Sequence, residues 1–180
     1  MLLEGQEETT CVLIKPDVVK RGVKLFCTIN HELTGGTVRL WELSCSVIRA
    51  TRGQIEAHYD KDDDWIIKTG KEVLEIYEKY GRNVKAELGT SDPYNLGKIV
   101  LGWMTDFMTS GDLVALVIQG DGAIQEVRKK AGRIREEYME DSLEQAVLEH
   151  RALENLIHAS ENPEEARKEL AIWFPDRTFS

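Results

Sequence analysis

The chain has 180 residues, of which 42% are hydrophobic, which suits one well-formed core in a single domain spanning 1–180. Its 23 Lys and Arg residues against 32 Asp and Glu give a net charge of −9, which argues against general binding to nucleic acid or to an anionic membrane surface. Neither a disulfide framework nor a zinc site is indicated by the cysteines, and no apolar run approaches the roughly 20 residues of a membrane-spanning helix. We therefore expect a soluble, unprocessed protein of the reducing cytoplasm, with free thiols at Cys11, Cys27 and Cys45.

The first predicted strand covers residues 9–14, a β-branched and apolar run. It stops at Lys15-Pro16-Asp17, because proline removes a backbone donor, and Lys15 is therefore placed at the end of a buried strand. A helix is predicted over about 25–33. The double glycine Gly35-Gly36 then turns the chain into a second strand over about 37–48.

The next part of the chain is predicted to be mainly helical. Thr51 is the N-cap of a short helix with Tyr59 at its end. The acidic run 60–64 lacks the glycine and the distal glutamate of a calcium loop, so a solvated turn is the better interpretation. Apolar residues at helical spacing predict helices over 65–80 and 99–108, joined by a loop rich in Gly, Asp, Pro and Asn over 81–97. Aromatic residues in such helices are more typical of a core than of a cofactor site.

A continuous apolar run predicts a buried strand over 113–118. The helix that follows, over about 124–131, projects Arg128 from its polar side and leads into Arg133-Ile134-Arg135, a basic cluster in an acidic chain. Two interpretations of this cluster stay open: a solvated helix end whose cations complement the helix dipole, or a clamp for an anion. The acidic segment 136–154 is predicted to be helical in part.

The chemistry is most naturally placed around His158. Residues 156–157 predict a short buried strand with His158 at its end, and Asn162 is the N-cap of a helix over 163–173. Glu169 falls on the side of that helix occupied by apolar residues, from where its carboxylate could fix the tautomer of His158 and leave the other ring nitrogen free to react. A histidine in such a place is more often structural than catalytic, so position alone leaves both interpretations open.

The order of short motifs along the chain resembles that of the nucleoside diphosphate kinases. The motifs are Ile14-Lys15-Pro16-Asp17 with Arg21-Gly22, His58-Tyr59, Thr109-Ser110-Gly111, Val127-Arg128-Lys129 and Asn155-Leu156-Ile157-His158-Ala159-Ser160. The first and last motifs together are specific to that family, and the resemblance covers nearly the whole chain, with a helical insertion at about 61–98 like that of the longer members. It implies an α/β (α+β) fold with a ferredoxin-like core: an antiparallel four-stranded sheet (βαββαβ) with helices on one face.

The resemblance also implies a site. It implies a phosphotransferase that passes the γ-phosphoryl group of ATP to a nucleoside diphosphate in a ping-pong exchange, through a phosphohistidine at His158. Glu169 matches the glutamate that orients the imidazole. The positions implied for nucleotide binding are Lys15, Arg128, Arg135, Tyr59 and Asn155. No protein ligand to a metal is implied, since Mg²⁺ arrives with the nucleotide, and Glu161 matches an acidic residue near it.

The chain departs from the family pattern in several places, among them Asp112 for a usual proline and Glu154 for a common arginine. Before Arg133 the family carries a phosphate-binding loop longer by about ten residues, with a threonine that donates to the phosphates, and both are missing here. That loop helps to assemble the family's trimers and hexamers, so a homo-oligomer is expected without a fixed size. Near Val100 the family stacks a phenylalanine on the base, whereas this chain offers aliphatic residues, with Trp65 or Trp103 as substitutes. Base preference and turnover stay open, and the alternative hypothesis is a degenerate, regulatory nucleotide-binding member of the family.

Overall fold

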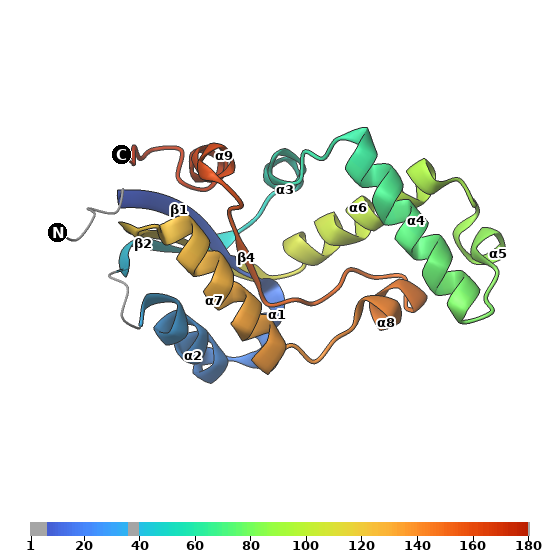
Figure 1. The fold of residues 1–180 in the computed structure, drawn as a ribbon, viewed down its shortest axis with the longest axis horizontal. Coiled ribbons are helices and arrows are strands. Elements are labelled where there is room, and N and C mark those ends of the chain that lie inside the picture. Colours follow the sequence, from blue (N-terminus) through green and yellow to red (C-terminus); the bar gives the residue numbers. More distant parts are fainter. Residues whose placement is uncertain (1–6, 36–39, 180) are drawn as a thin grey trace.

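The computed structural model describes residues 7–35 and 40–179. Within this part of the chain, one antiparallel sheet of four strands has the order β2-β3-β1-β4. The strands are β1 (Glu7–Ile14), β2 (Leu40–Arg49), β3 (Asp112–Asp121) and β4 (Ile157–Ala159). This order is that of the expected ferredoxin-like βαββαβ core, and the α+β fold class is confirmed (Figure 1).

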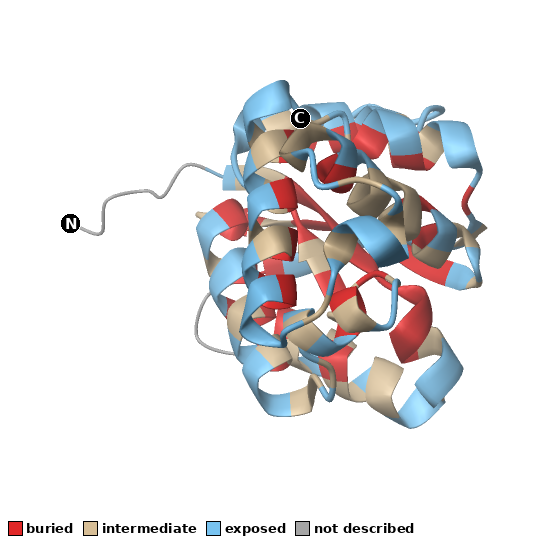
Figure 2. Ribbon diagram, turned by 90° about the vertical axis from the view of Figure 1, so that its right-hand side faces the viewer, coloured by how far each residue is buried: buried red, intermediate tan, exposed pale blue. Residues whose placement is uncertain are grey.

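The two central strands are β1 and β3. They pair antiparallel along their length, from Glu7 opposite Asp121 to Ile14 opposite Val114. Their continuous apolar sequences follow from their position, because helices cover both faces of the sheet and every side chain from Cys11 to Ile14 is buried. Figure 2 shows this buried layer between the outer helices.

One face of the sheet is covered by α2 (Val23–Thr34) and α7 (Ala123–Tyr138), the two helices of the βαββαβ core. The buried cluster on this face includes Val12, Ile14, Val114, Leu116 and Ile118 from the strands, and Ile29, Leu33, Val127 and Ile134 from the helices. The expectation of helices on one face alone was wrong, because the other face is covered by α3 (Arg52–His58), α9 (Pro163–Trp173) and the end of α6 (Pro93–Thr109). Its cluster includes Cys11, Leu13, Ile55, Met108, Leu170 and Trp173.

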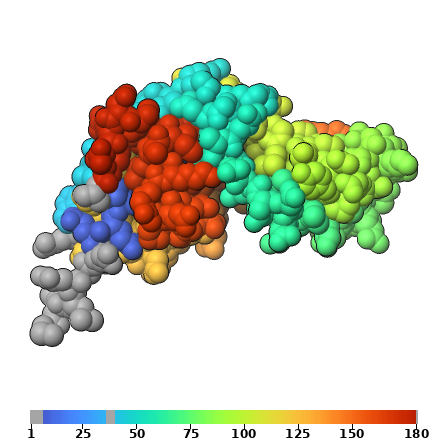
Figure 3. Space-filling model, turned by 90° about the horizontal axis from the view of Figure 1, so that it is seen from above, coloured from blue at the N-terminus to red at the C-terminus, as the bar shows by residue number. Residues whose placement is uncertain are grey.

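A helical lobe interrupts the chain between β2 and β3, and Figure 3 shows it projecting from the body of the molecule. It consists of α4 (Asp63–Lys79), α5 (Val84–Leu88) and most of α6, and α8 (Leu143–Leu148) packs against it. The lobe has a small core of its own, made by Val73, Ile76, Tyr77, Leu96 and Val147. Among the helices of the described ranges, none combines the length and the apolar character that spanning a bilayer requires.

Glycines allow α4 and α6 to cross closely. A Cβ atom on Gly70 would lie 1.7 Å from the carbonyl oxygen of Pro93, and one on Gly97 would lie 2.0 Å from that of Ile66. Any side chain at either position would therefore push the two helices apart.

The prediction of a loop over 81–97 was wrong, because α5 lies inside that range and α6 already begins at Pro93. The Asn, Asp and Pro that suggested a loop are helix starts: Asn83 and Asp92 accept backbone N–H groups as N-caps, and Pro93 occupies the first turn. In the same way, the acidic run 60–64, predicted as a turn, supplies the N-cap Asp62 and first turn of α4.

A short helix after β1 was also not predicted: α1 (Pro16–Arg21) has its proline in the first turn, where a missing N–H costs nothing. The predicted turn at Gly35-Gly36 and the start of the strand over 37–48 lie partly outside the described residues. Inside them, β2 begins at Leu40.

Candidate active site

The chain reaches the site through an unusual backbone conformation at Leu156, whose φ of 67° lies in the left-handed region that leucine rarely adopts. Two hydrogen bonds hold it there. The backbone N–H of Lys15 donates to the Leu156 carbonyl at 2.9 Å, and the Leu156 N–H donates to Oδ2 of Asp17 at 2.9 Å. In addition, Nζ of Lys15 donates to Oδ1 of Asn155 at 2.6 Å. The Lys15-Pro16-Asp17 motif thus fixes the segment just before His158.

His158 is the middle residue of β4 and pairs with Leu13 of the central strand β1. The sequence predicted a strand over 156–157 with His158 at its end. The strand instead covers Ile157–Ala159, because the left-handed Leu156 interrupts the extended chain and moves the start of the strand by one residue. The side chain of His158 is 19% exposed, so the ring is held on most sides yet can be reached from solvent.

Glu169 comes from the buried face of α9 and contacts His158, as predicted. Its Oε1 lies 2.8 Å from Nε2 of His158, and its Oε2 accepts a hydrogen bond from Ser160 Oγ at 2.7 Å. Ser160 in turn accepts the backbone N–H of Cys11 at 3.2 Å, which fixes its hydroxyl. A carboxylate acceptor places the imidazole proton on Nε2, so the lone pair of the neutral ring is on Nδ1.

The charge state of His158 follows from its surroundings. Burial, together with the positive charges of Lys15 and Arg135, lowers the pKa of His158 to about 3. The ring is therefore neutral near pH 7, which is the form in which histidine acts as a nucleophile. Burial also raises the pKa of Glu169.

Two arginines from α7 bind the backbone on either side of His158. Arg135 donates to the Ile157 carbonyl at 2.7 Å, and Arg128 donates to the Ala159 carbonyl at 3.3 Å. The Nε of Arg135 is buried and has no partner among the described residues. Burial lowers the pKa of Lys15 to about 8 and lowers that of Arg135 as well. A cluster of cations with an unused buried donor is suited to an anion such as phosphate.

His58 was missed as a site residue, although its neighbour Tyr59 was predicted. The His58 ring packs edge-on against that of His158, with 4.5 Å between centroids, and its Nδ1 accepts the indole N–H of Trp173 at 3.3 Å. Burial lowers the pKa of His58 to about 3. Tyr59 lies against His58, 4.7 Å between centroids, and burial raises the pKa of its phenol. The signal in the sequence was the His58-Tyr59 pair itself.

A second residue missed is Lys61, which lies in the run taken as a solvated acidic turn. Its charge contributes to lowering the pKa of both His158 and His58, so it adds to the positive potential at the site.

A cavity of about 220 Å³ adjoins these residues and opens between α4, α6 and α8. Its described lining brings together Lys15, Tyr59 and Asn155, three of the predicted nucleotide-binding residues. All three candidates for stacking on a base also line it: Trp65, Val100 and Trp103. One of these indoles, Trp103, is already stacked on His150, with 6.0 Å between centroids.

One group of described residues could hold a metal ion: ligand atoms of His58, His158 and Glu169 lie within 4.8 Å of one another. Two imidazoles and one carboxylate suit a transition metal rather than Mg²⁺, which prefers oxygen ligands. The carboxylate of Glu161 is 60% exposed and lies 3.4 Å from Arg128, at the rim of the site.

Comparisons with known proteins find relatives along nearly the whole chain. A family model described as nucleoside diphosphate kinase matches residues 95–179. A protein named nucleoside diphosphate kinase from Pyrobaculum aerophilum is 32% identical over 177 residues, which cover 93% of this chain and 94% of that protein. One of the same name from Mycobacteroides abscessus is also 32% identical, over 93% of this chain and 97% of its own length.

Solved structures of similar fold also match most of the chain. The crystal structure of an NDP kinase from Pyrobaculum aerophilum superposes with a TM-score of 0.81 at 32% identity, covering 93% of this chain and 96% of that one. A nucleoside diphosphate kinase from Borrelia burgdorferi, solved as a transition-state mimic with bound vanadate and ADP, superposes with a TM-score of 0.66. At 20% identity, with 97% of this chain and 92% of that one covered, the second match supports the fold alone.

Proposed function

The chain belongs to the nucleoside diphosphate kinase family and is a phosphotransferase, and from this premise we propose that it transfers the γ-phosphoryl group of ATP to a nucleoside diphosphate through a phosphohistidine at His158. The exchange is ping-pong. The first nucleotide leaves as a diphosphate before the second one enters, and both use the same site.

The observation that carries the proposal is the hydrogen bond between Nε2 of His158 and Glu169. It supports Nδ1 as the attacking atom, because the carboxylate holds the proton on the other nitrogen. In the first half-reaction Nδ1 forms a bond to the γ-phosphorus while the bond from that phosphorus to the bridging oxygen breaks, and the diphosphate leaves with the electron pair. The imidazole gains positive charge in this step, and Glu169 stabilises it. The second half-reaction is the reverse, with another diphosphate as acceptor.

Phosphoryl transfer depends mainly on positioning and on neutralising charge. We assign charge neutralisation to Lys15, Arg128 and Arg135, which surround His158 and offer a buried donor without a partner among the described residues. Asn155 and Tyr59, in the wall of the adjoining cavity, are assigned to the sugar and the phosphates. The nucleoside then occupies the cavity, with its phosphates directed toward the histidine.

Magnesium enters with the nucleotide in this proposal and neutralises phosphate charge when bound. The residues fit a cation of that kind, because Mg²⁺ at phosphate sites takes one or two carboxylates and completes its shell with phosphate oxygens and water. Glu161 is the carboxylate we assign to it.

The test is to incubate the protein with γ-labelled ATP and Mg²⁺ and to locate the label. We expect acid-labile label on His158, in the isomer that carries phosphorus on Nδ1, which ³¹P NMR of the denatured protein distinguishes from the Nε2 isomer. Addition of a nucleoside diphosphate should discharge the label into a triphosphate.

The control for this test is His158→Ala, which removes the nucleophile and leaves the other residues in place. Label that survives in His158→Ala, or label on Nε2 in the natural protein, would contradict the proposal. Saturable nucleotide binding without any label would instead point to a regulatory member of the family.

A further inference from the structure

The helical lobe supplies one wall of the cavity, and this wall includes a carboxylate as well as aromatic and basic side chains. Trp65, Lys68, Thr69 and Glu72 all come from α4 and all line the cavity. Their spacing of three, four and seven residues places them along one face of the helix. Since α4 runs away from β4 (Figure 1), Glu72 lies about 10 Å further along the helix axis than Trp65.

From this wall we infer that Glu72 selects the base of the nucleotide and favours guanine. The inference rests on the proposed function, because it takes the cavity to hold the nucleoside while the phosphates lie at His158.

Glu72 is the only carboxylate in the described lining of the cavity. It is half-buried, and it makes no hydrogen bond or ion pair with any other described residue. The remaining walls are mainly apolar and aromatic. The guanidinium of Arg151, which also lines the cavity, is already held by Asp141 at 2.6 Å and by Glu149 at 2.7 Å. The carboxylate of Glu72 is therefore an acceptor that lacks donors until a ligand brings them.

The opposite wall is fixed, so that a ligand must fit the cavity as it is built. The hydroxyl of Tyr77 in α4 lies 2.8 Å from Nε2 of His150, just after α8, and Arg82 donates to the Leu148 carbonyl at 2.7 Å. Glu87 accepts from both Tyr77 and Arg82. These contacts hold α8 against the lobe, and Leu143 and Val147 of α8 line the same cavity as Glu72.

The preference for guanine follows from the hydrogen-bond donors that each base can offer to the carboxylate of Glu72. A carboxylate accepts two adjacent donors best when they point the same way, as the N1–H and the exocyclic amino group of guanine do. Adenine, cytosine and uracil each offer a carboxylate only one such group, the amino group or the ring N–H. Hypoxanthine retains N1–H and lacks the amino group. Loss of one charge-assisted hydrogen bond corresponds to about a tenfold or greater loss of affinity.

The experiment measures dissociation constants of GDP, IDP, ADP, CDP and UDP by calorimetry, and then the rate at which each discharges the phosphorylated protein. We expect GDP to bind and react about tenfold better than IDP and ADP. In Glu72→Gln this preference should fall to near unity.

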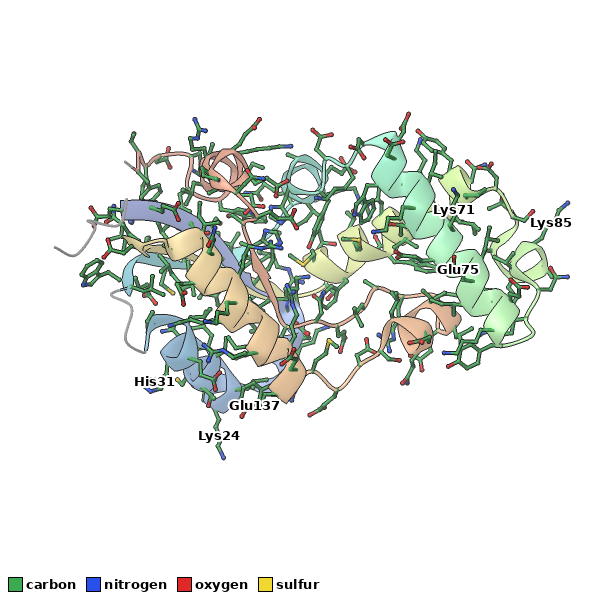
Figure 4. All side chains as sticks on the ribbon, viewed as in Figure 1. Lys24, His31, Lys71, Glu75, Lys85 and Glu137 are labelled. Atoms are coloured by element: carbon green, nitrogen blue, oxygen red, sulfur yellow. The ribbon has the colours of Figure 1, made fainter. Side chains whose placement is uncertain are left out.

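The matched control is Glu75→Gln, which makes the same change of charge one turn further along α4, at an exposed residue outside the cavity lining (Figure 4). It should keep the preference for GDP. Equal affinities in the natural protein, or a preference unchanged in Glu72→Gln, would overturn the inference. Because binding is measured without phosphoryl transfer, such a result stays distinct from a failure of the proposed function, which would show as absence of phosphohistidine.

Discussion

Arg135 and Arg133 lie two residues apart on α7 and differ completely in surroundings. Arg135 bonds the carbonyl beside His158, whereas Arg133 is exposed. We predict that Arg135→Ala raises the Michaelis constant for nucleotide about tenfold or more, because it removes a charge-assisted phosphate contact. Steady-state kinetics would check this, with Arg133→Ala as the control that leaves the constant nearly unchanged. An unchanged constant in Arg135→Ala would mean that another cation takes its place.

His58 and His158 make the stability of the protein depend on pH. Burial lowers the pKa of His58 and of His158 to about 3, below the value of about 6.5 in the unfolded chain. Between these values the unfolded state binds more protons than the folded one, so acidification through this window lowers the free energy of unfolding. The slope is at most about 1.4 kcal/mol per pH unit for each histidine.

Urea unfolding at pH 7 and pH 5 checks this dependence on pH. We expect the stability lost between the two pH values to be smaller in His58→Gln than in the natural protein. His31 is exposed on α2, and His31→Gln should leave the loss unchanged (Figure 4). Equal losses in all three proteins would show that His58 is not held neutral.

At the scale of residues, the sequence predicted which side chains lie around His158 better than it predicted the contacts among them. His158, Glu169, Lys15, Arg128 and Arg135 were all predicted, from a motif order and from helical spacing, and the structure brings them together. Their roles remain predictions. His58 had a signal in the His58-Tyr59 pair but was not assigned to the site, and Lys61 had none, because the relation of both residues to His158 depends on tertiary packing that is not local in sequence.

At the scale of elements, the crossing of α4 and α6 gives the sharpest prediction. Gly97→Ala would place a methyl group 2.0 Å from a backbone carbonyl of α4, which cannot move without the helix. We expect it to lower the free energy of unfolding by about 2 kcal/mol or more. Gly102 lies on the same helix, and a methyl group there would meet no described atom within 4 Å, so Gly102→Ala should raise stability by about 0.5–1 kcal/mol. Urea unfolding at constant m-value compares them, and equal effects would contradict the account.

The strands were predicted more reliably than the helix boundaries. The apolar runs of β1 and β3 have few alternatives once both faces of the sheet are covered, and their positions agree with the structure. In contrast, residue types such as those of Asn83, Asp92 and Pro93 are typical both of loops and of helix starts, and here they begin two helices. The choice between a loop and two helices depends on how the lobe packs, and that packing involves residues far apart in the sequence.

At the scale of the molecule, the edge strand β2 is the surface on which we expect assembly. Within the described sheet it is unpaired on one side, and it exposes Trp41, Leu43 and Val47, the last of them 71% exposed. An edge strand with exposed apolar side chains favours pairing with another chain. We predict a homo-oligomer in solution, measured by light scattering, that Val47→Glu shifts toward monomer. Tyr80→Glu, in the lobe, is the control and should leave the mass unchanged; a monomeric natural protein would contradict the prediction.

The pairing of β1 with β4 affects the order in which parts of the chain fold. Leu13 lies opposite His158, and the Lys15-Pro16-Asp17 segment holds Leu156, so the site joins residues about 140 positions apart. Contacts so distant in sequence close late in folding, and Glu169 leaves the ribosome later still. During synthesis the helical lobe can therefore fold before Leu13 and His158 pair. A fragment cut before α9 keeps His158 and lacks Glu169, so under the proposed function we expect it to accept no phosphoryl group until the two ends of the chain have met.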